Sequence, residues 1–242
     1  ANNLYLRNDY KDSIFNIIAT SELLPKKVYK YSDLSYYIFK DYIEKYYDKD
    51  LNVLSQKHFY ESIGANRTSY LPLGKYSLNE IIPSEIDDYY RYQKVQGYVH
   101  DMGAAMQGGI GGHAGLFSNA NDVAKIMQMY LQGGTYGGKR YLKLETIDKF
   151  NHQYYAHDEV RKGVGFDKLQ IKESEEATCG CVSSQSFGHS GFTGTYTWAD
   201  PESGIVYVFL SNRTFPTASN KGLLNANIRT DIQQIIQDAI MN

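Results

Sequence analysis

Apolar residues recur at helical spacing in several separate segments before residue 160. The longest such segment places Leu34, Ile38, Tyr42 and Tyr46 on one side of a helix, with Ser32 positioned to cap its first turn. The same spacing predicts other short helices, so the expected helical ranges are 9–20, 32–47, 52–63, 121–131 and 143–151. Residues 65–115 lack a regular period and are rich in glycine, which predicts long loops.

The pattern changes to strands after about residue 160. Residues 194–199 and 204–211 are rich in β-branched and aromatic side chains and flank a strong turn signal, Asp200-Pro201-Glu202-Ser203. A closing amphipathic helix is predicted over residues 225–239, with one apolar stripe of Ile228, Ile232, Ile235 and Ile236. This order of elements indicates an α+β fold. We expect a helical, loop-rich subdomain over residues 1–159 and an antiparallel sheet with its C-terminal helix over residues 160–242, together forming one structural unit.

Composition excludes several classes of function. The chain has 242 residues, of which 42% are hydrophobic and 21% charged, as in an ordinary globular protein. A net charge of −2 argues against nucleic acid as a partner, because phosphate binding needs a basic excess. No apolar run reaches the length of a membrane span, and the first residues show neither the basic nor the apolar region of a signal peptide.

The cysteine and histidine spacings give no sign of a metal or cofactor. Cys179 and Cys181 are only two residues apart, so we expect two unlinked loop cysteines rather than a strained disulfide or a zinc site. A dinucleotide-binding pattern is matched in form by the segment Gly109-Ile110-Gly111-Gly112-His113-Ala114. The residues before this segment have no strand character, which the pattern requires. Its glycines are expected to make tight turns or close approaches, and its histidine to have a structural role.

Two short segments carry candidate chemistry. His189-Ser190-Gly191 is expected at the start of a strand, where small residues can expose a backbone N–H to a developing oxyanion. Tyr31-Ser32-Asp33 stands at a predicted helix start. A tyrosine with a pKa near 10 becomes a useful proton shuttle only when a nearby cation stabilises its phenolate, and Lys30 points elsewhere on the chain. A Tyr that merely packs at a helix N-terminus is the alternative.

Taken together, four segments resemble the serine β-lactamase and penicillin-binding-protein superfamily, in its class C-like esterase and DD-peptidase branch. The segments are 31–36, 112–125, 132–140 and 188–194. The first signature of that family is Ser-x-x-Lys, and no serine of this sequence has a lysine three residues later. The resemblance implies a β-lactamase-like fold that lacks its N-terminal part, so this sequence is expected to be the C-terminal portion of such a domain.

The resemblance also implies roles for particular residues. Tyr31 would be the proton shuttle, and Asp33 would stand where the family usually has Asn. His189 and Ser190, on an edge strand, would contact the polar end of the substrate together with Gly191. Phe192 would give its backbone N–H to the oxyanion hole. The family usually has lysine at the position of His189. A mostly neutral histidine shifts the expectation from β-lactams toward esters and peptide-like amides, including cell-wall peptides.

The expected function is therefore that of the C-terminal part of a serine hydrolase with an acyl-enzyme mechanism, of esterase, DD-peptidase or amidase type, inactive as this chain alone. The alternatives are a non-catalytic cell-wall or glycan-binding module, and a domain fused to an N-acetylglucosaminidase-type glycoside hydrolase. No cofactor is expected. The parent is expected to be periplasmic or extracellular, and the incomplete sheet is expected to favour self-association.

Overall fold

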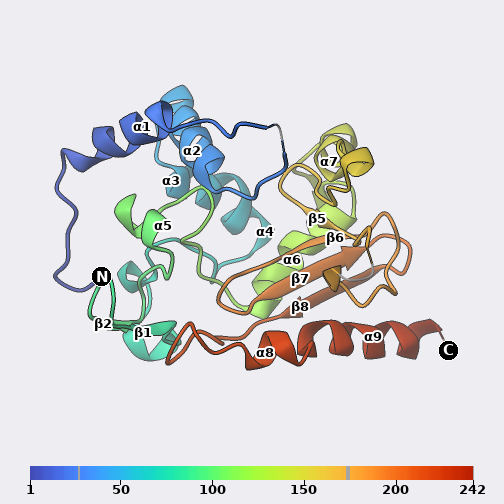
Figure 1. Ribbon diagram of the computed structural model, residues 1–242. Coiled ribbons are helices and arrows are strands. Elements are labelled where there is room, and N and C mark those ends of the chain that lie inside the picture. The colour runs from blue at the N-terminus through green and yellow to red at the C-terminus, as the bar shows by residue number, and fades with distance from the viewer. Residues whose placement is uncertain (27, 173–174, 242) are drawn as a thin grey trace. The chain divides into compact units, whose positions relative to one another are not determined.

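The computed structural model describes residues 1–26, 28–172 and 175–241 (Figure 1). They form two compact units, one of residues 1–60 and 68–117 and the other of residues 61–67 and 118–242. These two units are defined by which residues contact one another. The predicted boundary at residue 159 separates a helical part from a sheet part, and it stays a prediction.

The first unit is built mainly on helices that the apolar spacing predicted. Helix α1 covers Tyr10–Thr20 and α2 covers Leu34–Tyr47. The range predicted as 52–63 is helical throughout, in the order α3 (Leu51–Ser55), a π-helical turn (Gln56–Tyr60) and α4 (Glu61–Ile63), of which α4 already belongs to the second unit. Gly64 follows with a φ of 77°, which ends the run.

The range predicted as loops contains a small hairpin and a short helix. Strands β1 (Glu85–Asp87) and β2 (Gln93–Val95) pair antiparallel, and α5 covers Met102–Met106. Two 3₁₀ turns, Pro72–Gly74 and Leu78–Glu80, precede them. Three-residue strands are too short to leave a period in the sequence, so the pattern missed them. A buried ion pair between Arg91 Nε and Asp87 Oδ2, 2.9 Å apart, lies beside this hairpin.

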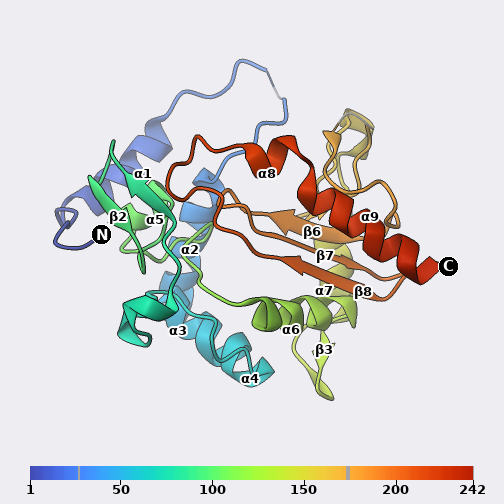
Figure 2. The ribbon, with the colours of Figure 1, turned by 90° about the horizontal axis from the view of Figure 1, so that it is seen from below.

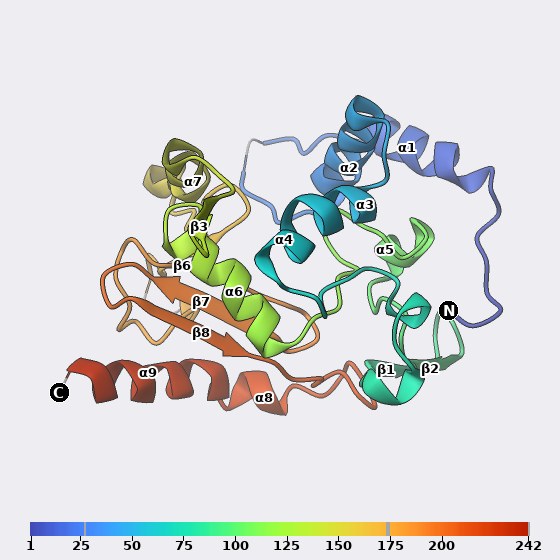
Figure 3. The ribbon, with the colours of Figure 1, turned by 180° about the vertical axis from the view of Figure 1, so that it is seen from behind.

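The second unit is a four-stranded antiparallel sheet between two helices. Its strands are β5 (Asp167–Lys168), β6 (Phe187–Ser190), β7 (Tyr196–Asp200) and β8 (Ile205–Phe209), in that spatial order. Figure 2 shows α6 (Ala120–Leu131) and α9 (Ile228–Met241) on opposite faces of this sheet, and Figure 3 shows α6 from the other side. The remaining short elements are β3 (Thr135–Tyr136), β4 (Lys139–Arg140), α7 (Leu144–Asn151), a 3₁₀ turn (Ala156–Asp158) and α8 (Gly222–Asn225).

Alternation along the strands sends side chains to two cores. Tyr196, Trp198 and Tyr207 form one core with Val182, against which Ile232 and Ile236 of α9 pack. On the other face Ala199 and Phe187 pack with Met127 of α6. Successive residues of a strand point to opposite faces of the sheet, so Trp198 lies on the face covered by α9 and its neighbour Ala199 on the face covered by α6.

Helix α9 buries a different stripe from the predicted one. Ile232 and Ile236 pack on the sheet, whereas Ile228 is 39% and Ile235 67% exposed. The buried stripe is completed by two glutamines, Gln233 and Gln237, instead. Gln233 Oε1 accepts hydrogen bonds from the Tyr196 hydroxyl and from the backbone N–H of Cys179, both at 3.1 Å, so this buried polar group is satisfied.

The expectation of two unlinked cysteines is wrong, because Cys179 and Cys181 form a disulfide. Their Cα atoms are 5.2 Å apart, within the usual range for a disulfide. Gly180 between them has a φ of 75°, a conformation that lets the chain turn back sharply enough to bring the two sulfurs together.

Among the described residues, none of the helices is both long and apolar enough to cross a bilayer.

Candidate functional site

The β6–β7 hairpin carries four of the six predicted site residues. His189 and Ser190 end β6, where they pair with Thr197 and Tyr196 of β7. They therefore close a strand, whereas the sequence placed them at the start of one. On the other side of β6, the pairing with β5 reaches only as far as Gly188. His189 and Ser190 therefore lie at an edge of the sheet, as predicted, because β5 is too short to pair with them.

The turn after β6 is fixed by the backbone. The N–H of Gly191 donates to the carbonyl of Thr195 at 2.8 Å, and the N–H of Gly194 donates to the carbonyl of Gly191 at 3.0 Å. Gly194 has a φ of 101°, which a residue with a side chain rarely adopts. Phe192 lies within this turn and is 64% exposed.

Close backbone approaches explain two glycines of the hairpin. A Cβ at Gly188 would collide with the carbonyl oxygen of Thr197 and the ring of Trp198, and a Cβ at Gly191 would collide with the side chain of Thr195. Small residues before and after His189 and Ser190 are therefore a packing requirement of the hairpin.

The hydrogen bond of His189 determines which ring nitrogen carries a proton. Nδ1 lies 2.8 Å from the carbonyl oxygen of Ser190. A carbonyl oxygen can only accept, so Nδ1 carries a proton and donates it to Ser190.

Tyr31 and Asp33 stand directly before α2. The N-cap of α2 is Asp33, one residue after the predicted Ser32, and the N–H of Leu34 donates to Oγ of Ser32 at 3.2 Å. The pKa of Tyr31 is raised above its ordinary value, first by burial, then by the negative charge of Asp33 and by a side-chain hydrogen bond to it. These effects keep the phenol protonated, so proton abstraction by Tyr31 requires a cation beside its oxygen.

The predicted site residues fall into two groups. His189, Ser190, Gly191 and Phe192 lie together on one hairpin of the second unit. Tyr31 and Asp33 belong to the first unit.

His113 pairs with Asp101 in the first unit, a contact that the sequence only partly predicted. His113 Nε2 lies 2.8 Å from Asp101 Oδ1, and the imidazole stacks on the ring of Tyr37 at 5.0 Å. Asp101 also accepts the N–H of Ala104 at 2.7 Å and so caps α5. These contacts agree with the structural role expected for His113, which stays a prediction, and its partner, twelve positions away, leaves no recognisable spacing in the sequence.

Arg213 is a contact of the hairpin that sequence reasoning missed. Its guanidinium carbon lies 4.8 Å from the centroid of the Phe192 ring, and its backbone N–H donates to the carbonyl of Thr193 at 3.0 Å. The only signal in the sequence is an isolated arginine after the second predicted strand, which by itself indicates nothing.

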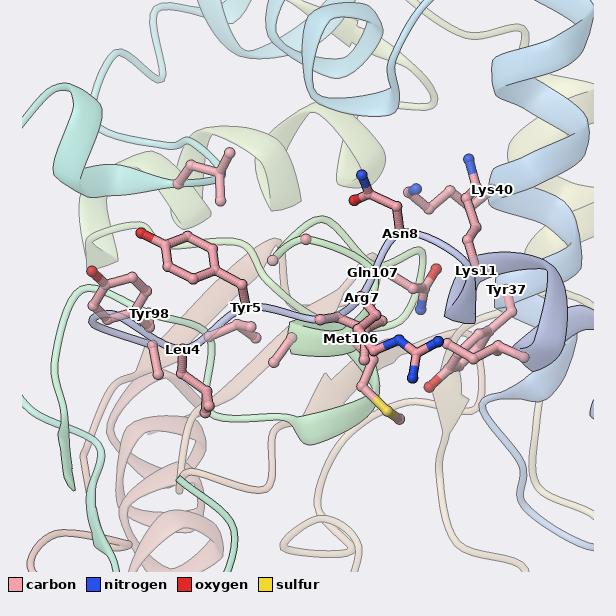
Figure 4. A pocket seen from close by; sticks show the side chains of 18 of the residues that line it. Leu4, Tyr5, Arg7, Asn8, Lys11, Tyr37, Lys40, Tyr98, Met106 and Gln107 are labelled. Atoms are coloured by element: carbon pink, nitrogen blue, oxygen red, sulfur yellow. The ribbon is translucent and has the colours of Figure 1, made fainter. Parts of the chain in front are cut away.

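A cavity of about 490 Å³ lies wholly within the first unit (Figure 4). Leu4, Tyr5 and Tyr98 line one end, and polar side chains including Lys11 and Gln107 line the other. Within the cavity lining, Lys40 forms an ion pair with Glu44 at 3.0 Å. None of the predicted site residues lines this cavity, so it is distinct from both groups.

Comparison with known proteins agrees with the fold. The family profile described as Beta-lactamase matches residues 2–228. A protein of Salmonella gallinarum named "Putative D-alanyl-D-alanine carboxypeptidase" is 31% identical over 212 residues, covering 82% of this chain and 48% of its own length. A protein of the same name from Escherichia coli is 31% identical over 205 residues, covering 79% and 46%. The chain thus spans about half the length of these curated relatives.

Two solved structures share the fold at low sequence identity. EstCE1, a hydrolase with promiscuous acyltransferase activity, gives a TM-score of 0.63 at 16% identity, covering 100% of this chain and 64% of its own. A penicillin-binding protein homologue from Caulobacter crescentus gives a TM-score of 0.59 at 16% identity, and the match covers 84% of this chain and 58% of that protein.

The fold is that of the β-lactamase and penicillin-binding-protein group, with mixed helices and an antiparallel sheet. The chain belongs to the Beta-lactamase family.

Proposed function

We propose that residues 1–242 supply the oxyanion and substrate-binding side of a serine hydrolase that acts on esters or peptide-like amides, including cell-wall peptides. The observation that carries this proposal is the end of β6, where His189, Ser190 and the Phe192 turn follow the last residue paired with β5. Such a strand end lets an extended substrate lie beside the backbone. The family membership and the names of the carboxypeptidase relatives support the same chemistry.

The proposed reaction is acyl transfer in two steps. A serine oxygen attacks the substrate carbonyl, its proton moves to a base, and the leaving alcohol or amine takes a proton as its bond to the acyl carbon breaks. Water then cleaves the acyl-enzyme. The N–H of Phe192 donates to the carbonyl oxygen as it becomes negatively charged. Ser190 Oγ and His189 Nε2 hydrogen-bond to the polar end of the substrate, and Tyr31 moves the proton once a cation lowers its pKa.

The nucleophile of this proposal is not among residues 1–242, because no serine there has a lysine at the third following position. We propose that it comes from a Ser-x-x-Lys motif outside these residues and that residues 1–242 alone do not form an acyl-enzyme. A fluorophosphonate probe should leave chain 1–242 unlabelled and should label a longer form that carries such a motif. Labelling of any serine of chain 1–242 would contradict this part of the proposal.

The role of the Phe192 N–H is testable in that longer form. Phe192→Pro removes the N–H and should slow acylation by roughly 10²–10³-fold, as loss of one oxyanion donor does elsewhere. Phe192→Ala removes the exposed ring, keeps the N–H and serves as the matched control. Equal rates for the two variants, both shown to be folded, would overturn the assignment.

The site of action and the assembly are further parts of the proposal. A cell-wall substrate places the protein in the periplasm or outside the cell. We also propose that β8, which lies at one end of the sheet order and reads Ile205-Val206-Tyr207-Val208-Phe209, pairs with a second copy. An uncharged edge strand of this kind favours pairing with another strand. The alternatives of a binding module and of a fusion to a glycoside hydrolase stay predictions.

A further inference from the structure

The disulfide between Cys179 and Cys181 is a feature of the second unit that the proposed function does not use. It encloses one residue, Gly180, which is exposed, while the two cysteines are half-buried. A disulfide stabilises a fold mainly by closing a loop of the unfolded chain, and this effect grows with the length of the loop. Because this disulfide encloses a single residue, it contributes little to the stability of the fold.

Hydrogen bonds hold the segment around the disulfide in place. The backbone N–H of Cys179 donates to Gln233 Oε1 of α9 at 3.1 Å. The N–H of Gly180 donates to Thr178 Oγ1 at 3.1 Å. Thr178 is itself buried and donates to Gln170 Oε1 from its backbone N–H at 3.1 Å and from its hydroxyl at 2.6 Å. None of these four hydrogen bonds involves a sulfur, so opening the disulfide leaves them in place.

The backbone also keeps the two cysteines close enough for the bond to form again. Their Cα atoms are 5.2 Å apart, within the usual range for a disulfide. Gly180 between them has a φ of 75°, which glycine adopts without steric cost. A segment that stays in this conformation after reduction presents two thiols to one another, and the bond then re-forms within one molecule.

The two sulfurs differ in their surroundings. Cys179 packs against the apolar core around Trp198, and Cys181 is not among the described residues of that core. The backbone N–H of Cys181 donates to Sγ of Cys179 at 3.3 Å. A hydrogen bond to a sulfur favours its thiolate form, so Cys179 is the better leaving group. Since Cys179 is also the shielded sulfur, an incoming thiolate is expected to attack Cys181.

We propose that Cys179 and Cys181 form an exchangeable disulfide, which small thiols open and small disulfides restore while the protein stays folded. In the opening direction, the thiolate of a small thiol attacks Sγ of Cys181, the S–S bond breaks, and Cys179 leaves as a thiolate. A second small thiolate then attacks the sulfur of the first in the mixed disulfide, and Cys181 leaves. The protein gains two electrons and two protons, and two small thiols are oxidised to one small disulfide. This site is separate from the proposed hydrolase function.

Equilibration of chain 1–242 with glutathione and its disulfide tests this exchange. Samples over a range of ratios, up to a large excess of the thiol, are quenched with acid and then alkylated with N-ethylmaleimide, and mass spectrometry counts the modified cysteines. We expect a reversible change from none to two modified cysteines. Circular dichroism and the emission maximum of Trp198, the single tryptophan of the sequence, should stay those of the folded protein throughout. A disulfide that stays closed at every ratio, or that opens only as the protein unfolds, would overturn the proposal.

Single variants test which sulfur is attacked. Cys179→Ser leaves Cys181 as the one thiol and should form a mixed disulfide with glutathione disulfide quickly. Cys181→Ser leaves the shielded Cys179 and should react about tenfold more slowly or less, because access limits exchange. Equal rates would contradict the assignment of Cys181. The double variant Cys179→Ser, Cys181→Ser should keep the circular dichroism of the unchanged chain, and loss of its fold would show that the disulfide is structural and overturn the proposal.

Discussion

His189 donates a hydrogen bond from Nδ1 to the carbonyl oxygen of its neighbour Ser190, across 2.8 Å. The strand end that the family resemblance assigns to substrate binding is therefore partly occupied by its own backbone. The imidazole of His189 is a titratable group and not a permanent cation.

The titration of Tyr31 tests the electrostatics before α2. Because burial and the charge of Asp33 raise its pKa, the phenol should titrate above its ordinary value of 10.0 and stay protonated throughout the neutral range. Asp33→Asn should lower the pKa toward that value without removing the effect of burial. NMR of ring-labelled tyrosine, assigned with Tyr31→Phe, measures this. Asp41→Asn on the same helix is the control, and a pKa below 10.0 in the unchanged chain would contradict the prediction.

Substitution of Gly188 tests the close packing of the hairpin. Gly188→Ala places a Cβ against the carbonyl of Thr197 and the ring of Trp198, neither of which can move without disturbing β7. We expect the free energy of unfolding to fall by about 1–3 kcal/mol or more. Chemical denaturation measures the change. Gly74→Ala, where a Cβ meets nothing within 4 Å, should have little effect, and a similar small effect at Gly188 would show that the hairpin tolerates the Cβ.

The ion pair of Arg91 and Asp87 tests the contribution of a buried charge. Their side chains are 1% and 0% exposed, and Arg91 also donates to the carbonyls of Val99 and His100. Arg91→Met leaves the Asp87 carboxylate buried without its partner and should cost about 3–5 kcal/mol of stability. The matched variant Arg7→Met breaks an ion pair with Asp9 that is 75% and 62% exposed, and should cost at most about 1 kcal/mol. Equal costs would contradict the assigned burial.

The lowered pKa of Asp87 predicts how the free energy of unfolding depends on pH. Burial raises the pKa of Asp87, but hydrogen bonds from the N–H groups of Tyr90, Arg91 and Tyr89, with the Arg91 charge, lower it overall below 3.8. A pKa that is lower in the folded than in the unfolded chain stabilises the fold above the unfolded pKa. This contribution should be lost as the pH falls below about 4 toward the folded pKa. Asp87→Asn should flatten that acid limb in a pH series of unfolding curves.

Self-association tests the proposed pairing of β8. Val208→Lys places a charge on the edge strand and should shift the protein toward monomer, because a charged edge opposes pairing with another strand. Sedimentation over a range of concentrations measures the change. Val208→Thr, which keeps the branched shape and adds no charge, should associate as the unchanged chain does. A monomer at every concentration in the unchanged chain would end this proposal.

Much of the local structure could be predicted because it depends on neighbours in the sequence. The period of 3.6 residues in 34–47 predicts a helix, and α2 is found there. The turn signal at 200–203 predicts a reversal between two strands, and it lies between β7 and β8. Among the missed elements are β1, β2 and α5, and the β1–β2 hairpin is held by side chains such as Arg91 rather than by any period. The stripe of α9 was misread because Gln233 finds hydrogen bonds from Tyr196 and Cys179, and these make its burial acceptable.

By itself, the sequence determined the α+β class, the Gly188–Thr195 segment, and the absence of a Ser-x-x-Lys motif. These depend on residue types and short spacings, which are local properties of the chain. Only the tertiary structure decided that the pairing of β6 with β5 stops at Gly188, that His189 turns to the carbonyl of Ser190, and that Arg213 lies over the ring of Phe192. Such contacts depend on where the backbone brings distant or differently oriented groups together, and no spacing of residue types specifies that geometry.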